Sequence, residues 1–256
     1  MTPEELEKLP KPIERTMSRL ELAVMAEVVD RIRQAGEITP VVDHLLNRMY
    51  ALGTGKLKLK ALIQEALSDA DKTVDQIYRT AVSTDHIRNK ALYESVGKEY
   101  LPYEDNEWLQ QLVEASRRQT KDDLRTFENL TKTTGFNVIV GGRRVFSPLS
   151  EYFEQSLDRS LFSIASGMQT YSQAVGAVID EMTRSGLRVV DYASGKSDRI
   201  EVAARRAVMT GIAQMTGKIN EKIMEELGTK YVEVDYHIGS RPSHMIWQGK
   251  VYKWNK

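Results

Sequence analysis

Residues 59–81 read LKALIQEALSDADKTVDQIYRTA, and this stretch decides the fold class. Its apolar side chains recur every three or four residues, at Leu59, Ile63, Ala66, Ala70, Val74, Ile77 and Ala81. Residues with this spacing share one face of an α-helix, so the pattern predicts a helix with an apolar stripe. A continuation through Ile87, Ala91 and Val96 makes the helix longer than about 30 residues. Such a stripe packs either on a partner or second copy, or within an intrachain helical hairpin.

Two more helices are expected before this stretch. Apolar side chains at Ile13, Met17, Leu20, Val24, Val28 and Ile32 predict a helix from about residue 13 to residue 33, ended by Gly36. Thr39-Pro40 has the character of an N-cap followed by proline at the first helical position. We expect a short helix to begin there and to end at Gly53-Thr54-Gly55.

Residues 97–105 look like a connector, and Asn106 is expected to open another long helix. Its stripe consists of Leu109, Leu112, Leu124, Phe127 and Leu130. Ser116 and Thr120 dilute the middle of this stripe, and charged residues flank it. A stripe this narrow predicts an extended, partly exposed rod instead of a buried core helix.

Short strands enter the pattern after Gly135. Residues 136–146 read as a hairpin whose apolar arms flank a Gly141-Gly142 turn. Further helices are expected from Leu149, from about 170 to 184 and from about 199 to 227, with strands at 187–192 and 230–237. The predicted class is mainly α with a small β element, an α+β fold. We divide it into a helical region, 1–104, and a helical rod leading into an α+β domain, 105–256.

Composition narrows the function. The 36 basic and 36 acidic residues cancel, so no global field draws the chain to nucleic acid or to an anionic membrane. No run approaches the roughly 18 apolar residues of a membrane span. The absence of cysteine excludes disulfides, thiolate catalysis and cysteine-bound zinc. The acidic start, residues 1–7, lacks the pattern of a secretory signal, so we expect cytoplasmic synthesis.

The densest group of chemically capable residues lies near the C-terminus, in residues 235–244. Asp235 and His237 share one face of the expected strand, where a carboxylate can orient an imidazole. A tight turn at 239–242 would return His244 to the same place, with Arg241 as a fork for a carboxylate or phosphate. Three interpretations follow: an acid/base site, a metal site short of ligands, or a structural polar cluster.

The structural cluster is the interpretation we favour. Two histidines supply too few ligands for zinc, so no metal and no cofactor are predicted. Neither Ser240 nor Ser243 sits in a nucleophile elbow, so no catalytic residue is assigned. The predicted cluster comprises Asp235, His237, Arg241, Ser243, His244 and Gly249. Two local basic patches are present, Arg143-Arg144 and Arg205-Arg206 with Arg199. Local nucleic-acid contacts are assigned to Arg199, Arg205 and Arg206, although a solvated charged face is the more common meaning of such groups.

The C-terminal motif resembles that of phage minor capsid proteins, relatives of the head-morphogenesis proteins typified by phage Mu. The resemblance rests on a histidine, a short turn, Arg241-Pro242-Ser243-His244 and then Gly249-Lys250-Val251-Tyr252. Ala203-Ala204-Arg205-Arg206-Ala207 lies where the family has an alanine-arginine block. Members from tailed phages of Gram-positive hosts usually continue to a second element containing Asn-Cys-Arg-His. This chain stops at Lys256 without it, so we expect a truncated C-terminal domain.

The resemblance implies a structural virion component in the head interior, assembled in the host cytoplasm. Its implied partners are the portal protein, capsid proteins and packaged DNA, with self-association through the long helices and no membrane. We expect no enzymatic activity. The alternative is a hydrolase or toxin-like transferase that uses His237 and His244 with Asp235.

Overall fold

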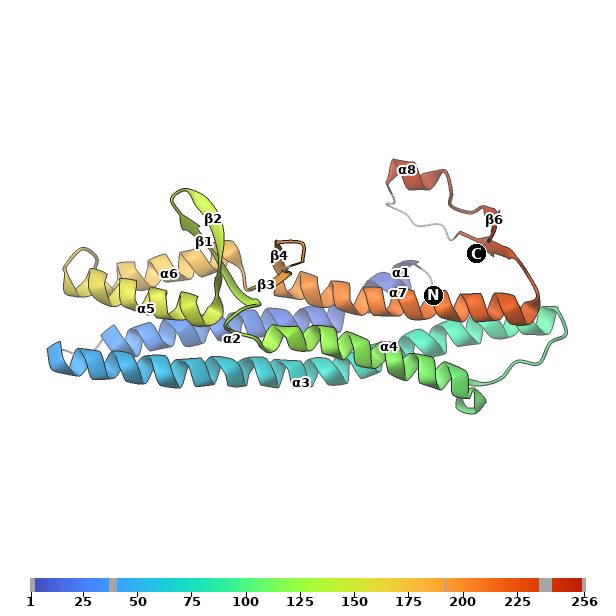
Figure 1. Cartoon of the computed structure of the whole chain (residues 1–256), viewed down its shortest axis with the longest axis horizontal. Coiled ribbons are helices and arrows are strands. Elements are labelled where there is room, and N and C mark those ends of the chain that lie inside the picture. The colour runs from blue at the N-terminus through green and yellow to red at the C-terminus, as the bar shows by residue number, and fades with distance from the viewer. Residues whose placement is uncertain (1–2, 37–40, 192, 235–240, 255–256) are drawn as a thin grey trace. The chain divides into compact units, whose positions relative to one another are not determined.

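A computed structural model describes residues 3–36, 41–191, 193–234 and 241–254 (Figure 1). The chain forms two compact units, each assembled from separate segments. Unit 1 contains residues 1–12, 73–121 and 207–256, and unit 2 contains residues 13–72 and 122–206. The predicted division into residues 1–104 and 105–256 stays a prediction.

Helices dominate the described chain, which confirms the predicted class. They are α1 (Pro3–Lys8), α2 (Lys11–Gly36), α3 (Val41–Ser95), α4 (Glu107–Arg125), α5 (Leu149–Ala165), α6 (Tyr171–Ser185), α7 (Ile200–Leu227) and α8 (Pro242–Met245), with single 3-10 turns η1 (Tyr103–Asp105) and η2 (Thr126–Glu128). Helices α3, α4 and α7 each contribute residues to both units. Asn106 caps α4 as predicted, because its side-chain oxygen accepts a hydrogen bond from the backbone N–H of Leu109 at 3.0 Å.

The apolar stripe of α3 is buried by the chain itself. Leu59, Ile63 and Ala70 are fully buried in unit 2, and Val74, Ile77 and Ala81 are at most 3% exposed in unit 1. Of the two interpretations of this stripe, intrachain packing is therefore confirmed. A second copy of the chain is not needed to remove these side chains from water.

The predicted helix break at Gly53-Thr54-Gly55 is wrong, because α3 passes through it without interruption. At Gly55, an added Cβ would lie 2.5 Å from the ring of Phe153, which is fully buried on α5. Gly55 is thus a close-packing residue that lets α5 approach α3. Thr54 contributes a 2.7 Å hydrogen bond from its hydroxyl to the carbonyl of Tyr50, one turn earlier in the helix.

The middle of α4 is polar for a structural reason that the sequence pattern conceals. Thr120 and Ser116 are buried, and both meet the hydroxyl of Tyr78 on α3. That hydroxyl lies 2.7 Å from the Thr120 hydroxyl and donates to the Ser116 carbonyl at 3.3 Å. At Gly211 on α7, a Cβ would come within 2.2 Å of both hydroxyl oxygens. The backbone of α7 therefore approaches α3 and α4 closely at Gly211.

Two expected helical stripes are corrected in part. Helix α4 ends at Arg125, so Phe127 and Leu130 are buried beyond its end, Phe127 within η2. For α7, helical spacing predicts the stripe Ala203, Ala207, Gly211, Met215, Ile219 and Ile223, and in the first half of the helix the buried positions lie one residue later. They are Ile200, Ala204, Val208, Ile212, Met215 and Ile219.

Unit 2 holds a four-stranded antiparallel sheet. Its order is β2-β1-β3-β4, formed by β1 (Thr134–Val140), β2 (Arg143–Pro148), β3 (Arg188–Asp191) and β4 (Lys196–Arg199). The predicted hairpin with its Gly-Gly turn is confirmed, since Val140 pairs with Arg143 and both Gly141 and Gly142 have positive φ. The sequence pattern does not predict strand β4, because its residues are all polar or charged.

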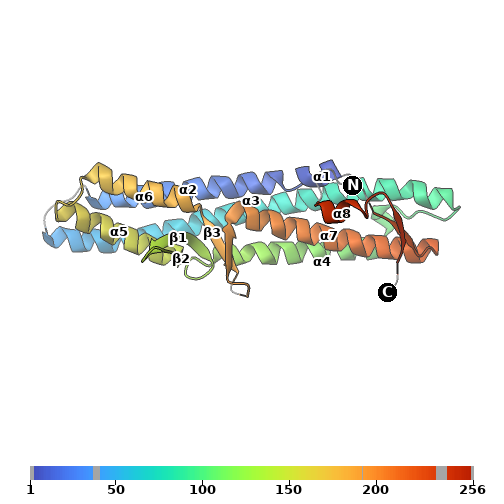
Figure 2. The ribbon, with the colours of Figure 1, turned by 90° about the horizontal axis from the view of Figure 1, so that it is seen from above.

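Helices α5 and α6 lie side by side in both views of the ribbon (Figures 1 and 2). Thr170 begins α6 with a capping box, in which it exchanges hydrogen bonds with Gln173. Tyr152 and Phe153 of α5 are fully buried, and the Tyr152 ring lies 4.7 Å from the ring of Phe136 on β1. These contacts fix the two helices against the sheet, and a polar hollow opens beside them.

Candidate functional site

The C-terminal segment, residues 231–254, is described at residues 231–234 and 241–254, which contain two paired strands and one helical turn. Strand β5 (Tyr231–Glu233) pairs with β6 (Val251–Lys253), with Val232 opposite Tyr252. Backbone hydrogen bonds extend the pairing at both ends. At one end the N–H of Val234 donates to the Lys250 carbonyl at 3.0 Å and the N–H of Gly249 to the Val234 carbonyl at 2.7 Å, and at the other the N–H of Trp254 donates to the Lys230 carbonyl at 2.7 Å. Gly249 has φ +64°, a conformation that favours glycine over other residues. The predicted strand is confirmed for its first half, and the rest of it lies outside the described residues.

Helix α8 carries the Arg-Pro-Ser-His motif. Arg241 occupies the N-cap position, and Pro242 follows at the first helical position, where it needs no donor. The carbonyl of Arg241 accepts hydrogen bonds from the backbone N–H of His244 at 2.8 Å and of Met245 at 3.2 Å. The rings of His244 and Trp247 are stacked, with centroids 5.9 Å apart. The motif is thus a folded turn.

The motif side chains are exposed. Arg241, Ser243 and His244 all lie open to solvent on α8, in contrast to the buried side chains of the helical stripes. Asp235 and His237 lie outside the described residues, so their grouping with His244 and Arg241 stays a prediction. Within the described part of the chain, no group of three or more histidine or acidic residues is placed to hold a metal ion.

Large apolar side chains surround the motif and are exposed as well. Their exposed fractions run from 38% at Tyr252 to 64% at Val251. The set comprises Tyr231, Met245, Ile246, Trp247, Val251, Tyr252 and Trp254. Seven such side chains within 24 residues contrast with the helical core, where comparable residues are covered.

The three arginines assigned to nucleic acid each have a carboxylate neighbour. Arg205 pairs with Glu14 of α2 at 2.8 Å, and Arg206 forms an ion pair with Asp198 of β4. Arg199 lies 3.8 Å from Glu201. The nucleic-acid assignment of these residues stays a prediction, and the structure shows that their charges are already matched locally.

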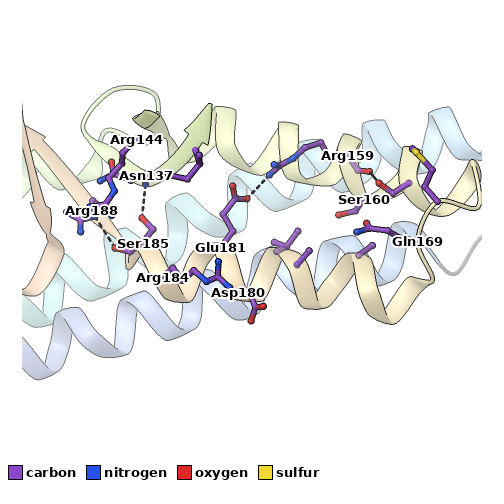
Figure 3. Close-up of a pocket in the computed structure, with 16 residues that line it drawn as sticks. Asn137, Arg144, Arg159, Ser160, Gln169, Asp180, Glu181, Arg184, Ser185 and Arg188 are labelled. Atoms are coloured by element: carbon purple, nitrogen blue, oxygen red, sulfur yellow. Dashed lines mark hydrogen bonds and ion pairs between the residues drawn. The ribbon is translucent and has the colours of Figure 1, made fainter. Parts of the chain in front are cut away.

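A different group of arginines lines a hollow of about 1000 Å³ in unit 2 (Figure 3). Strands β1 to β3 and helices α5 and α6 form its walls. It contains Arg144, Arg159, Arg184 and Arg188, with two acidic residues, Asp180 and Glu181. The four arginines are spread over residues 144–188 without a common spacing and meet only through the sheet and the two helices, so no local sequence pattern predicts the group. The only signal was the Arg143-Arg144 pair after the Gly-Gly turn.

Positively charged side chains repel one another at the end of the hollow where Arg188 lies. Arg188 and Arg199 face each other across β3 and β4 in direct register. Burial lowers the pKa of Arg188, and the nearby guanidinium groups of Arg144 and Arg199 lower it further. Arg188 is held in place by hydrogen bonds to two carbonyls, from Nε to Ser185 at 3.0 Å and from a terminal nitrogen to Ser197 at 2.9 Å.

Comparison with protein families now identifies the chain. The family model described as phage minor capsid protein 2 matches residues 1–255. The chain belongs to this family. Membership confirms a structural phage function and a place among virion proteins, and it implies interaction with other structural proteins of the particle. Comparison with curated proteins and with solved structures yields no significant match.

Two further findings concern this minor capsid protein. None of its described helices is long and apolar enough to cross a membrane. The family match covers the C-terminal segment together with the helical regions, so the exposed motif is part of the shared sequence and not an appendage. Kinship with the phage Mu type and the Gram-positive host range stay predictions from the motif.

Proposed function

We propose that this minor capsid protein associates with the portal in the head interior and docks through its C-terminal segment, residues 231–254. The observation that carries this proposal is the contrast in exposure. The helical stripes are buried within the chain, whereas the C-terminal segment leaves seven large apolar side chains in contact with water. Clustered exposed apolar residues on a soluble domain commonly mark a protein interaction site.

The composition of the segment favours a protein partner. Tryptophan, tyrosine and methionine are enriched in the centres of protein interfaces, and Trp247, Trp254, Tyr252 and Met245 supply all three types here. The short hairpin holds them on a preformed turn, which reduces the entropy lost on binding. Portal and capsid subunits are the partners that the family's structural role supports.

A capture experiment with the portal protein from the same genome tests the proposal. Wild-type chain is expected to retain the portal, and the double variant Trp247→Ala/Tyr252→Ala is expected to lose most of it. Truncation of one central aromatic residue commonly costs about 2 kcal/mol, roughly thirtyfold in affinity. Failure of wild-type protein both to bind the portal and to enter virions would contradict the proposal.

The matched control is Leu22→Ala/Leu57→Ala. Both leucines lie on helices, and they are 67% and 71% exposed. This variant removes a comparable exposed apolar surface outside the segment, so it should bind the portal as wild type does. Equal loss of portal binding in the two double variants would show nonspecific hydrophobic association instead of a docking site.

Hydrolase or transferase activity is not supported by the described geometry. His244 is exposed and stacks on Trp247, and in the described part of the motif no carboxylate contacts it. The variant His237→Ala/His244→Ala separates the roles. A structural role predicts reduced assembly into particles, whereas catalysis predicts normal assembly with loss of a chemical activity.

A further inference from the structure

We propose that the hollow between β1–β3, α5 and α6 binds the phosphodiester backbone of a nucleic acid. This site is separate from the C-terminal segment and does not include Arg199, Arg205 or Arg206. Figure 3 shows guanidinium groups from β2, β3, α5 and α6 around one cavity. Four separate elements therefore contribute positive charge to a single surface feature.

The charge balance of the hollow is positive. Glu181 is already occupied, since it accepts hydrogen bonds from Arg159 at 2.7 Å and from the hydroxyl of Tyr152 at 3.3 Å. Asp180 is the second acid of the lining. Within the described part of the chain, neither Arg144 nor Arg184 forms an ion pair with a carboxylate. Two exposed guanidinium groups are thus available to an incoming anion.

The arrangement suits a chain of anions better than a single one. Arg159 is joined to Glu181 on α6, and Arg184 follows three residues later, roughly 4.5 Å further along the helix axis. Arg188 and Arg144 lie beyond it at the sheet end (Figure 3). A row of cations along an elongated hollow matches the row of charges on a phosphate backbone.

Part of the remaining lining can contact phosphate oxygens, and the rest is apolar. Ser160 and Gln169 provide neutral polar groups, and a guanidinium fork can bind two phosphate oxygens at once. A bound phosphate would also relieve the repulsion between Arg188 and Arg144. Bases are not read by this surface, so the binding is expected to be independent of sequence.

The β1–β2 hairpin extends this surface. Its turn brings Arg143 next to Arg144, and the flanking Ile139, Val140 and Val145 are 65%, 60% and 46% exposed. The hairpin can therefore add the positive charge of Arg143 beside a duplex whose phosphate backbone lies along the hollow. Arg143 is outside the lining, which allows hairpin and hollow to be tested separately.

The test is fluorescence anisotropy of a labelled 20-base-pair DNA duplex at several salt concentrations. The variant Arg144→Gln/Arg184→Gln is expected to bind roughly tenfold more weakly and to lower the log–log salt slope by about 2, one unit for each lost phosphate contact. The charge-matched control Lys58→Gln/Lys60→Gln, on an exposed part of α3, should bind as wild type does.

A gain-of-function variant keeps the test independent of folding defects. Asp180→Asn removes the acid one turn before Arg184, so it should tighten binding several-fold with a steeper salt slope. No binding by wild type at low salt, or equal weakening in both double variants, would overturn the proposal. Equal displacement of the duplex by polyglutamate or by a free nucleoside triphosphate would overturn it too. These outcomes leave the portal capture experiment unaffected.

Discussion

The helices and the C-terminal segment of this minor capsid protein use apolar residues in opposite ways. Ile63 on α3 is fully buried, whereas Trp247 after α8 is 55% exposed. The sequence pattern of α3 looked equally suited to a partner, yet the chain itself covers it. Apolar periodicity thus reports that a surface will be buried, and only the folded arrangement shows whether the covering comes from within the chain.

The largest expected effect tests this contrast directly. Ile63→Ala should lower the free energy of unfolding by about 2–5 kcal/mol, because it leaves a cavity in a packed interior. Trp247→Ala removes a larger side chain but should change stability by less than about 0.5 kcal/mol. Urea denaturation followed by circular dichroism measures both. A small loss with Ile63→Ala would mean that the stripe is not packed within the chain.

Two glycines of α7 sharpen the contrast within one helix. Gly211→Ala should destabilise the protein by about 1–3 kcal/mol, because the new methyl group collides with the buried hydroxyls of Tyr78 and Thr120. Gly217 has open space around it, so Gly217→Ala should stabilise by about 0.5–1 kcal/mol through helix propensity. The two shifts in urea midpoint should have opposite signs, and shifts of the same sign would contradict close packing at Gly211.

The fold could be predicted from sequence wherever periodicity or a cap dominated. The α3 stripe, the Asn106 cap and the Gly141-Gly142 hairpin are local signals, and each appears as expected. Gly55 misled the prediction, because a glycine that breaks a helix and one that admits a ring look the same in sequence. Only the position of Phe153 on α5 distinguishes them.

The sites were less predictable for a different reason. The exposed motif around His244 was found because its unusual residues are consecutive. The arginine hollow depends on four elements that meet in space, and its residues have no common spacing. Charge matching is equally hidden, since Arg205 finds its partner in Glu14, far away along the chain. Long-range pairing of this kind leaves no local pattern.

A smaller effect is expected at an ion pair within unit 2. Arg48 contacts Asp158 on α5 through two parallel hydrogen bonds of 2.5 and 2.6 Å, and these bonds raise the pKa of Arg48. Both side chains are partly exposed, so Arg48→Gln should cost only about 0.5–1 kcal/mol, and less in high salt. Lys72→Gln removes an exposed pair with Asp69 and should have almost no effect. The free energies of unfolding of the two variants are measured at low and high salt. If the loss of stability in Arg48→Gln does not depend on salt, the side chain stabilises the fold by packing and not by its charge.

The smallest effect concerns a half-buried carboxylate in the same unit, Glu21. Burial raises the pKa of Glu21, and the Glu201 carboxylate raises it further, against a lowering by Arg199. Above the ordinary glutamate pKa of about 4.3, the folded state therefore holds this proton more tightly than the unfolded chain does. The contribution of Glu21 to the free energy of unfolding therefore decreases as the pH rises from about 4.3 through the raised pKa. Above that pKa the folded state must carry an unfavourable charge at Glu21.

Glu21→Gln removes that titration. The variant should gain stability relative to wild type at pH 7, and the gain should shrink toward pH 4, where Glu21 is protonated. Urea unfolding at several pH values measures the difference between the two proteins. Asp69→Asn, at an exposed position on α3, serves as the control and should show no comparable trend. A difference that grows toward acid pH would mean that Glu21 is stabilised as the anion, with Arg199 outweighing burial and Glu201.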